Sequence, residues 1–234
     1  GVADLSTASI DIRSCVDSAL SQVEHLASEL GVEVVVHVPE EPVAVECDSR
    51  RVERILRNLL ANAIDHSEGN PVIVDGGATE DAVGIAVTDS GVGLKEGQEE
   101  LVFNRFWRAD SSRKRHSGGT GLGLAIARED AVLHGGTLDA IGYYGVGSRF
   151  RLILPRTPGQ QVESEPIALE VPGAPKPIEA EEQFALELSA DPEAPAVKAE
   201  TDNGIVWPSE REARAVEPPF NQDSVSDFEE EAQR

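Results

Sequence analysis

The chain has 234 residues, with 43 acidic and 20 basic side chains and a net charge of −23 at pH 7. Such a charge argues against a nucleic-acid-binding protein, because phosphate backbones need a basic surface, and against direct docking on anionic lipid. The two cysteines, Cys15 and Cys47, are too few for a disulfide framework or a four-ligand zinc site. Both lie in apolar-periodic runs, so we expect buried free thiols in a reducing cytoplasm. No run approaches the roughly 18 apolar residues of a membrane-spanning helix.

The acidic charge and the prolines are concentrated toward the C-terminus. Residues 158–234 hold 19 acids, 5 bases and 10 of the 14 prolines, whereas residues 1–157 hold 24 acids and 15 bases. Apolar residues in the C-terminal part stand singly or in pairs, which cannot bury enough surface to offset the entropy of ordering. The sequence therefore predicts one domain over residues 1–157 and an acidic, proline-rich disordered tail over residues 158–234.

The predicted elements of this domain alternate between helices and strands. Apolar residues at helical spacing predict helices over residues 12–30, 49–66 and 122–134. Alternating apolar residues predict strands at 32–38, 43–46, 72–75, 83–89, 137–141 and 148–154. Residues 108–119 are polar and lack periodicity, which is typical of a mobile loop. This order predicts an α+β fold, a two-layer sandwich with helices on one face of a mixed, mostly antiparallel sheet.

Asn58 and Asn62 lie one helical turn apart on the second predicted helix, away from its apolar stripe. Both amides therefore project from one face. An amide carbonyl is a hard oxygen ligand suited to Mg²⁺, which binds few protein groups and keeps waters and phosphates. Taken alone, the pair is better explained as two solvated surface residues.

Two glycine-rich motifs follow. In Asp89-Ser-Gly91-Val-Gly93, a carboxylate at a strand end can accept a hydrogen bond from an exocyclic amine such as that of adenine, although a plain turn explains this motif equally well. Residues 118–124, GGTGLGL, open the third predicted helix and would present backbone N–H groups to a phosphate. They match neither a Walker loop nor a dinucleotide fingerprint, and a flexible linker is the alternative.

A basic and aromatic segment lies between these two motifs. Residues 103–108, FNRFWR, are followed by Arg113-Lys-Arg115, which form the one basic cluster of an acidic sequence. This segment could close over a polyphosphate as a lid. Packing aromatics with solvated charges are the alternative.

Taken in this order, the N-x-x-x-N helix, D-x-G-x-G, F-x-x-F and G-T-G-L-G-L resemble the ATP-binding domain of bacterial sensor histidine kinases, with the Bergerat (GHKL) fold. The resemblance covers about residues 10–156. Residues 51–67, RVERILRNLLANAIDHS, and residues 102–110, VFNRFWRAD, are most similar to actinobacterial members of the MtrB type, whose response regulator is MtrA. The resemblance implies a protein-histidine kinase that uses ATP and Mg²⁺.

The resemblance also implies a role for each motif residue. Asn62 would hold Mg²⁺, with Asn58 assisting at the metal or the phosphates. Asp89 would bind the adenine amine, and Gly91 and Gly93 would shape the adenine pocket.

Phe103 and Phe106 would anchor the lid, and Arg105 or Arg108 would contact phosphate. Ser148 would lie near the base. The glycine motif would surround the phosphates, through residues Gly119, Thr120, Gly121, Leu122 and Gly123.

The sequence departs from the family after Asn62, where many members carry Lys-Tyr, with the lysine on phosphate and the tyrosine stacked on adenine. Here these positions are Asp65 and His66. His66 can still stack, but Asp65 cannot serve as a phosphate cation, although an arginine could substitute. We do not expect His66 to bind metal, because no second ligand stands at metal-site spacing.

None of the five histidines resembles a phosphoacceptor, and the sequence has no methionine. We therefore expect the phosphoacceptor helices, a HAMP region, a sensor and the membrane spans to precede Gly1. The fragment would be a cytoplasmic domain of a homodimeric membrane protein. It would bind Mg²⁺-ATP without autophosphorylating alone, and its partners would be the upstream dimerisation domain and an MtrA-like response regulator.

Three alternatives remain at this point. Hydrolytic ATPases of the same fold, and anti-sigma serine kinases, usually carry a glutamate at the position of Asn58. A degenerate domain would bind nucleotide or partners without phosphoryl transfer, and Asp65 is the one residue that favours it.

Overall fold

The computed structural model describes residues 5–108 and 120–174. Within these residues the elements follow one another as β1 (Ala8–Asp11), α1 (Ile12–Leu30), β2 (Val34–His37), β3 (Ala44–Cys47), α2 (Ser49–His66), β4 (Val72–Ala78), β5 (Ala82–Asp89), α3 (Gln98–Leu101), α4 (Gly123–Leu133), β6 (Thr137–Tyr143) and β7 (Gly147–Pro155). None of the helices in these two ranges has the length and apolar character needed to cross a bilayer.

The ends of the two long helices are fixed by local hydrogen bonds. The Asp11 carboxylate accepts from the Arg13 N–H at the start of α1, and the Asp48 carboxylate accepts from the Arg51 N–H at the start of α2. Gly31 ends α1 in the left-handed conformation, φ 66°, with its N–H turned back to the last carbonyls of the helix. The helix boundaries predicted from the sequence are confirmed here.

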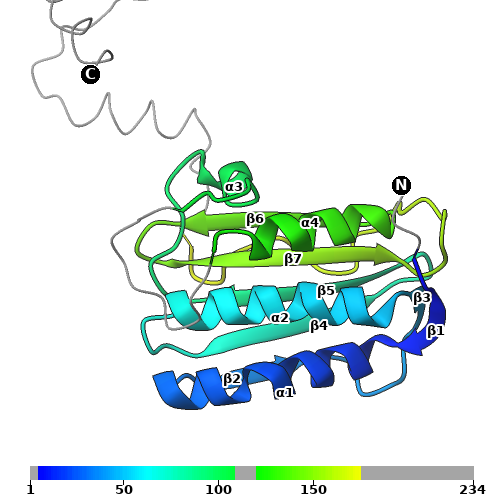
Figure 1. Cartoon of the computed structure of the whole chain (residues 1–234), viewed down its shortest axis with the longest axis horizontal. Coiled ribbons are helices and arrows are strands. Elements are labelled where there is room, and N and C mark those ends of the chain that lie inside the picture. The colour runs from blue at the N-terminus through cyan, green and yellow to red at the C-terminus, as the bar shows by residue number, and fades with distance from the viewer. Residues whose placement is uncertain (1–4, 109–119, 175–234) are drawn as a thin grey trace, which may run out of the picture. The chain divides into compact units, whose positions relative to one another are not determined.

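Five strands form one mixed sheet in the order β2-β4-β5-β7-β6, in which β2 and β4 are parallel and the other neighbours are antiparallel. Helices α1, α2 and α4 lie side by side over one face of this sheet (Figure 1). The predicted α+β sandwich is confirmed. The sequence did not predict β1, a four-residue strand that pairs with β3 apart from the main sheet.

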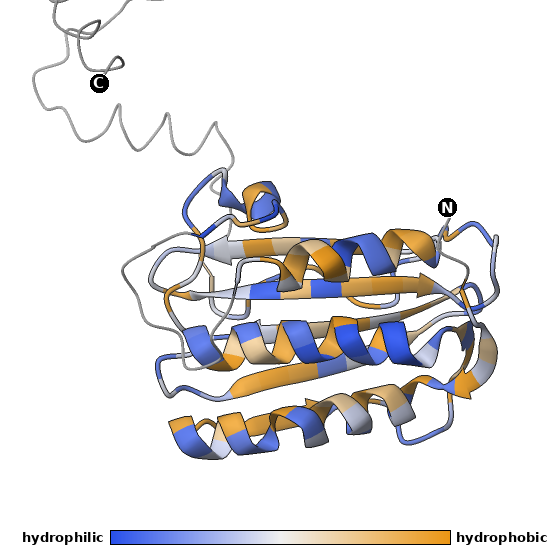
Figure 2. Cartoon of the chain, viewed as in Figure 1, coloured by the Kyte–Doolittle hydropathy of each residue, from blue (hydrophilic) through white to orange (hydrophobic). Residues whose placement is uncertain are grey.

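The apolar stripe of α2 faces the sheet and forms the centre of the core. All seven of its members are buried: Val52, Ile55, Leu56, Leu59, Leu60, Ala63 and Ile64. Figure 2 shows the hydrophilic side of α2 turned away from the sheet. Cys15 and Cys47 are buried and unpaired in the same core, as predicted. A hydrogen bond with the Cys47 thiol, together with burial, raises the pKa of Cys15.

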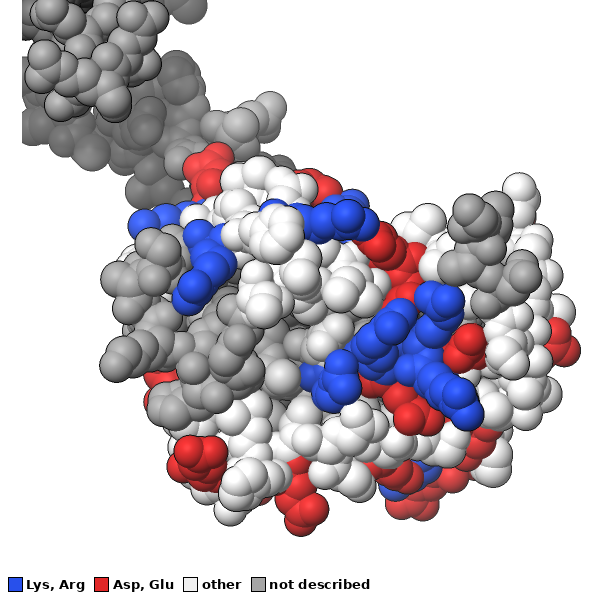
Figure 3. Space-filling model, in the orientation of Figure 1, with Lys and Arg blue, Asp and Glu red and all other residues white. Residues whose placement is uncertain are grey.

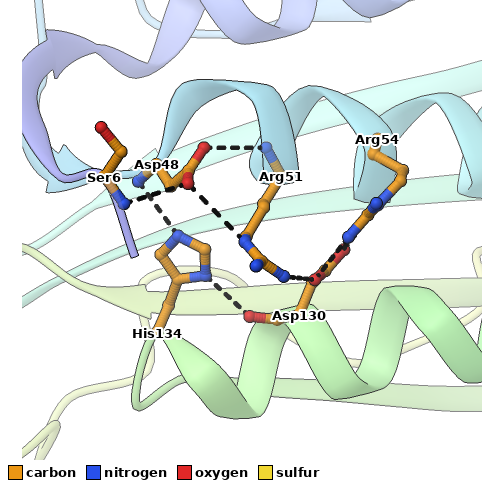
Figure 4. A network of polar contacts seen from close by, with 6 residues as sticks. All are labelled: Ser6, Asp48, Arg51, Arg54, Asp130 and His134. Carbon is orange, nitrogen blue, oxygen red and sulfur yellow. Dashed lines mark hydrogen bonds and ion pairs between the residues drawn. The ribbon is translucent and has the colours of Figure 1, made fainter. Parts of the chain in front are cut away.

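A network of polar contacts joins α2 to α4 (Figure 4). Asp130 of α4 is 2% exposed and accepts hydrogen bonds from Arg51 (2.9 Å) and Arg54 (2.8 Å) of α2. His134 accepts from the Asp48 N–H through Nε2 (3.1 Å) and donates from Nδ1 to the Asp130 carbonyl (2.7 Å). The network therefore fixes the N-terminal part of α2 against the C-terminal part of α4.

The structure differs from the predicted domain boundary at Thr157. Residues 158–174 continue past β7 and lie against the sheet face opposite the helices, where Figure 1 shows the yellow segment behind the strands. Val171 is buried, and the Glu163 N–H donates to the Asp81 carboxylate at 2.7 Å. Isolated apolar residues suffice here because they pack on a surface that is already folded. The rest of the predicted tail, residues 175–234, and the predicted loop residues 109–119 lie outside the described residues.

Candidate functional site

A cavity of about 730 Å³ opens beside α2, between α1, the segment after β5 and the start of α4. Sequence motifs that lie far apart along the chain meet in its walls. The predicted site residues among its lining are Asn58, Asn62, His66, Gly93, Thr120, Gly121, Gly123 and Ser148.

Asn58 connects α2 to the glycine motif. Its side-chain Nδ2 donates to the carbonyl oxygen of Gly123 at 2.9 Å, which leaves the amide oxygen Oδ1 as the acceptor. A Cβ at Gly123 would lie 3.5 Å from the Asn58 side chain, so the start of α4 packs closely on this amide. Asn62 follows one turn later on the same face of α2 and lines the same cavity.

The donor set fits Mg²⁺ better than a transition metal. Mg²⁺ is held by few protein oxygens and completes its shell with water and substrate phosphates, and the amide oxygens of Asn58 and Asn62 offer such ligands. Across residues 5–108 and 120–174, no three His, Cys, Asp or Glu side chains are grouped closely enough to hold a metal ion. A metal here would therefore depend on the phosphates of a bound nucleotide.

Asp89 lies at the end of β5 and is 1% exposed. Its two carboxylate oxygens accept hydrogen bonds from the Ser148 hydroxyl at 2.5 Å and from the Gly91 N–H at 3.0 Å. Burial raises the pKa of Asp89, against the opposing effect of these hydrogen bonds. Ser148 lines the cavity, so the carboxylate lies directly next to the cavity wall.

Gly91 and Gly93 allow other backbone segments to approach closely. A Cβ at Gly91 would lie 1.8 Å from the carbonyl oxygen of His66, and one at Gly93 would lie 1.9 Å from that of Tyr143. Gly93 also has φ +69°, which favours glycine. The turn after β5 is thus held between the end of α2 and the β6–β7 hairpin, and Gly93 contributes to the cavity wall.

The glycine motif borders the cavity at the start of α4. Thr120, Gly121 and Gly123 line it, Leu122 occupies the N-cap position without lining it, and Gly119 lies outside the described residues. The first N–H groups of α4 carry the positive end of the helix dipole, which favours an anion.

Trp107 of the predicted lid segment lines the cavity, whereas Phe103, Arg105, Phe106 and Arg108 do not. Phe103 is buried and packs edge-on against Phe150, with ring centroids 6.1 Å apart. Phe106 is 70% exposed, and Arg105 forms an ion pair with Glu129 at 2.5 Å, away from the cavity. Arg108 is exposed, and it too is not among the lining residues.

Two cations that belong to none of the sequence motifs also line the cavity. Arg57 and Lys95 both line it, and the Lys95 Nζ atom stands 5.2 Å from the centre of the Tyr144 ring. The position next to Asn58 is a signal that could have identified Arg57. Figure 3 shows basic side chains gathered over α2, which contains arginines and no lysine. Asp65 is not among the lining residues, whereas His66 is.

No sequence motif indicated that residues of α1 line the cavity. Gln22, Val23 and Leu26 line the cavity, although their spacing is that of an ordinary amphipathic helix. Helix packing alone brings them to the asparagines.

The model of the family "Histidine kinase-, DNA gyrase B-, and HSP90-like ATPase" matches residues 47–158. The sensor histidine kinase MtrB of Mycolicibacterium paratuberculosis is 57% identical over 177 residues, which are 76% of this chain and 31% of that protein. The structure of the mycobacterial sensor histidine kinase MprB is 29% identical with a TM-score of 0.55, covering 65% of this chain and 99% of that chain. Full-length ShkA in complex with AMPPNP is 25% identical with a TM-score of 0.59, covering 69% of this chain and 33% of that chain.

The chain spans about a third of the length of the MtrB proteins it matches. The 177-residue match is longer than residues 1–157, so the similarity to MtrB continues into the segment after β7. The matched family, the identity to MtrB and the shared fold all agree with the motifs that meet in the cavity. Residues 47–158 belong to the family of histidine kinase-, DNA gyrase B- and HSP90-like ATPases, and the chain carries the ATP-binding catalytic domain of a sensor histidine kinase.

Proposed function

We propose that this domain binds Mg²⁺-ATP in the cavity and transfers the γ-phosphoryl group to a histidine on a separate dimerisation domain. From there the group would pass to an aspartate of an MtrA-like response regulator. The observation that carries the proposal is the contact between Asn58 and Gly123, because it joins the asparagine helix to the glycine motif inside one cavity.

The two ends of the cavity suit the two ends of the nucleotide. At one end, Asp89 and Ser148 would accept hydrogen bonds from the exocyclic amine of adenine, and His66 would stack on the adenine ring. Asn58, Asn62 and the N-terminus of α4 would receive the phosphates at the other. Arg57 and Lys95 would supply positive charge to the phosphates. In many family members this charge comes from a lysine at the position of Asp65.

Asn58 and Asn62 would hold Mg²⁺, which neutralises charge on the phosphates when it is bound. The chain's own residues position the γ-phosphoryl group and stabilise its charge through the amides at the start of α4 and the side chain of Arg57. The acceptor histidine brings its own nucleophile.

The side chain of Asn58 distinguishes phosphoryl transfer to a histidine from hydrolysis of ATP. An asparagine cannot take a proton from an attacking water, as a glutamate in its place would. This favours transfer to an incoming histidine over hydrolysis. The degenerate alternative rests on the missing phosphate cation at Asp65, and it is weakened because Arg57 and Lys95 line the cavity.

We further propose that the domain acts as the cytoplasmic part of a homodimeric membrane sensor kinase. In that arrangement the isolated domain binds nucleotide but labels itself only when the phosphoacceptor domain is supplied.

Titration calorimetry with Mg²⁺-ATP tests the binding site. Asn62→Ala should weaken Mg²⁺-ATP binding by about tenfold or more, because an oxygen ligand of the metal is lost. Gln160→Ala is the control, since the Gln160 amide is exposed and lies outside the cavity and the predicted lid. Unchanged affinity in the Asn62 variant would remove the metal assignment.

Phosphoryl transfer needs its own experiment. The domain is mixed with γ-labelled ATP, Mg²⁺ and the phosphoacceptor domain of an MtrB-type kinase, and acid-labile label on that domain is followed with time. Binding of ATP without any labelling would favour the degenerate alternative.

A further inference from the structure

The sheet face opposite the helices contains a pair of glycines at its centre. Gly77 of β4 and Gly84 of β5 are register partners. A Cβ at Gly77 would lie 2.1 Å from the carbonyl oxygen of Pro166, and one at Gly84 would lie 2.6 Å from Cγ2 of Ile167. Glycine weakens a strand interior, so a glycine pair in this place marks a close approach by another segment.

Two arginines of β7 border the glycine pair. Arg149 donates from Nε to the carbonyl of Ala168 at 3.2 Å, and Arg151 donates to the carbonyl of Ile167 at 3.1 Å. Arg151 also forms an ion pair with Glu165. These contacts bind the backbone of a peptide without regular secondary structure, together with one acidic side chain.

Arg149 is held in place by the sheet itself. It is buried, with an ion pair to Asp75 at 2.7 Å and a hydrogen bond to the Thr88 hydroxyl at 2.7 Å. The position of Arg149 therefore does not depend on the peptide. Its guanidinium group is preorganised to donate a hydrogen bond even when residues 163–171 are not bound.

The turn between β4 and β5 holds the start of the same peptide. The Asp81 carboxylate accepts from the N–H groups of Glu163 (2.7 Å) and Ser164 (3.1 Å). The Ser164 hydroxyl donates to Thr79 at 2.6 Å. At the other end, Val171 is buried.

We propose that this face of the sheet is a peptide-binding groove, which in this chain holds the chain's own residues 163–171. The glycine pair makes room for Pro166 and Ile167, while Asp81, Arg149 and Arg151 bind the backbone. The ligand class is a peptide that bends over the glycine pair and carries an acidic residue two positions before an isoleucine. The short connection from β7 gives the segment a high effective concentration, so it outcompetes free peptides.

Three forms of the full chain test the groove: the original chain, Ile167→Asp and Gly84→Val. Hydrogen exchange followed by mass spectrometry should show protection of residues 163–171 in the original chain. Both variants should lose about tenfold or more of this protection. Valine suits a strand, so β5 should stay protected in Gly84→Val. Mg²⁺-ATP binding should be retained in all three, because the groove lies opposite the nucleotide cavity.

A labelled synthetic peptide with the sequence of residues 160–174 then probes the groove in trans. It should bind the Ile167→Asp chain, whose groove is intact but vacated. It should not bind the original chain, which is occupied, or the Gly84→Val chain, which is blocked. The same peptide carrying Ile167→Asp is the control and should bind none of them.

Several results would overturn the proposal. One is exchange of residues 163–171 in the original chain as fast as in an unstructured peptide, and another is unchanged protection in either variant. Failure of the peptide to bind the Ile167→Asp chain, or equal binding to all three, would also refute it. The original chain could also form a concentration-dependent dimer that Ile167→Asp abolishes. That result would mean that the groove binds residues 163–171 of a second copy, and it would overturn the proposal that the chain's own segment occupies it.

Discussion

Asp89 carries a carboxylate in a place from which water is excluded. It is 1% exposed, and burial raises its pKa above the ordinary value of about 4. A raised folded-state pKa means that the folded state binds the proton more tightly than the unfolded state does. The group therefore favours folding fully below its unfolded pKa, and this contribution is lost as the pH rises through the folded pKa.

Asp89→Asn should remove this pH dependence. We expect the free energy of unfolding of the variant to rise relative to that of the original chain between pH 4 and pH 7. Urea unfolding at several pH values measures it, with the exposed Asp17→Asn as the control. The same variant should bind ATP about tenfold or more weakly, because a buried acceptor for the adenine amine is replaced. A constant difference in unfolding free energy across this pH range would contradict the argument.

Arg57 is the cation adjacent to the asparagine pair. Since it lines the cavity from an exposed position on α2, its contribution should be modest and specific to phosphates. Arg57→Gln should weaken ATP binding roughly threefold to tenfold while leaving adenosine binding unchanged. Arg50→Gln, on the same helix but outside the cavity, provides the matched control in a calorimetric titration. Equal losses for ATP and adenosine would show that Arg57 does not contact phosphate.

At the scale of elements, one buried acid and two arginines contribute to the contact between α2 and α4. Asp130→Asn should cost about 1–3 kcal/mol of unfolding free energy, because the arginines left behind are partly solvated. Replacing Arg51 and Arg54 together by alanine should cost more, about 3–5 kcal/mol, since the Asp130 charge would stay buried without a partner. Urea denaturation of both variants compares the two costs. The reverse order would contradict this argument, because it would mean that an unpaired Asp130 carboxylate costs less than two arginines without their acceptor.

At the scale of the whole molecule, the negative charge is divided between a folded domain and a C-terminal region with most of the prolines. The domain extends at least to Ala174, since residues 158–174 pack on the sheet. A chain ending at residue 174 should unfold at the same urea concentration as the full chain. A chain ending at residue 157 should lose about 2–4 kcal/mol, because buried apolar side chains such as Val171 are removed. Equal stability of the two truncated chains would contradict this boundary.

The sequence alone determined the helix ends, the core stripe of α2, the fold class and most motif residues of the cavity. Asp11, Gly31 and Asp48 act through hydrogen bonds a few residues away, so their effect can be predicted locally. The family resemblance identified Asn58 and Asn62, which as an isolated pair would have been assigned to the surface.

The tertiary structure decided what surrounds these motifs. Packing between elements far apart in the sequence brought α1 to the cavity, buried Asp89 and brought Lys95 into the same cavity as the asparagines. It also placed Arg105 on Glu129, and Ile167 over Gly84. Such contacts depend on the distance between surfaces after folding. The spacing of apolar residues within one segment predicts its secondary structure, but it does not predict its distance from another segment.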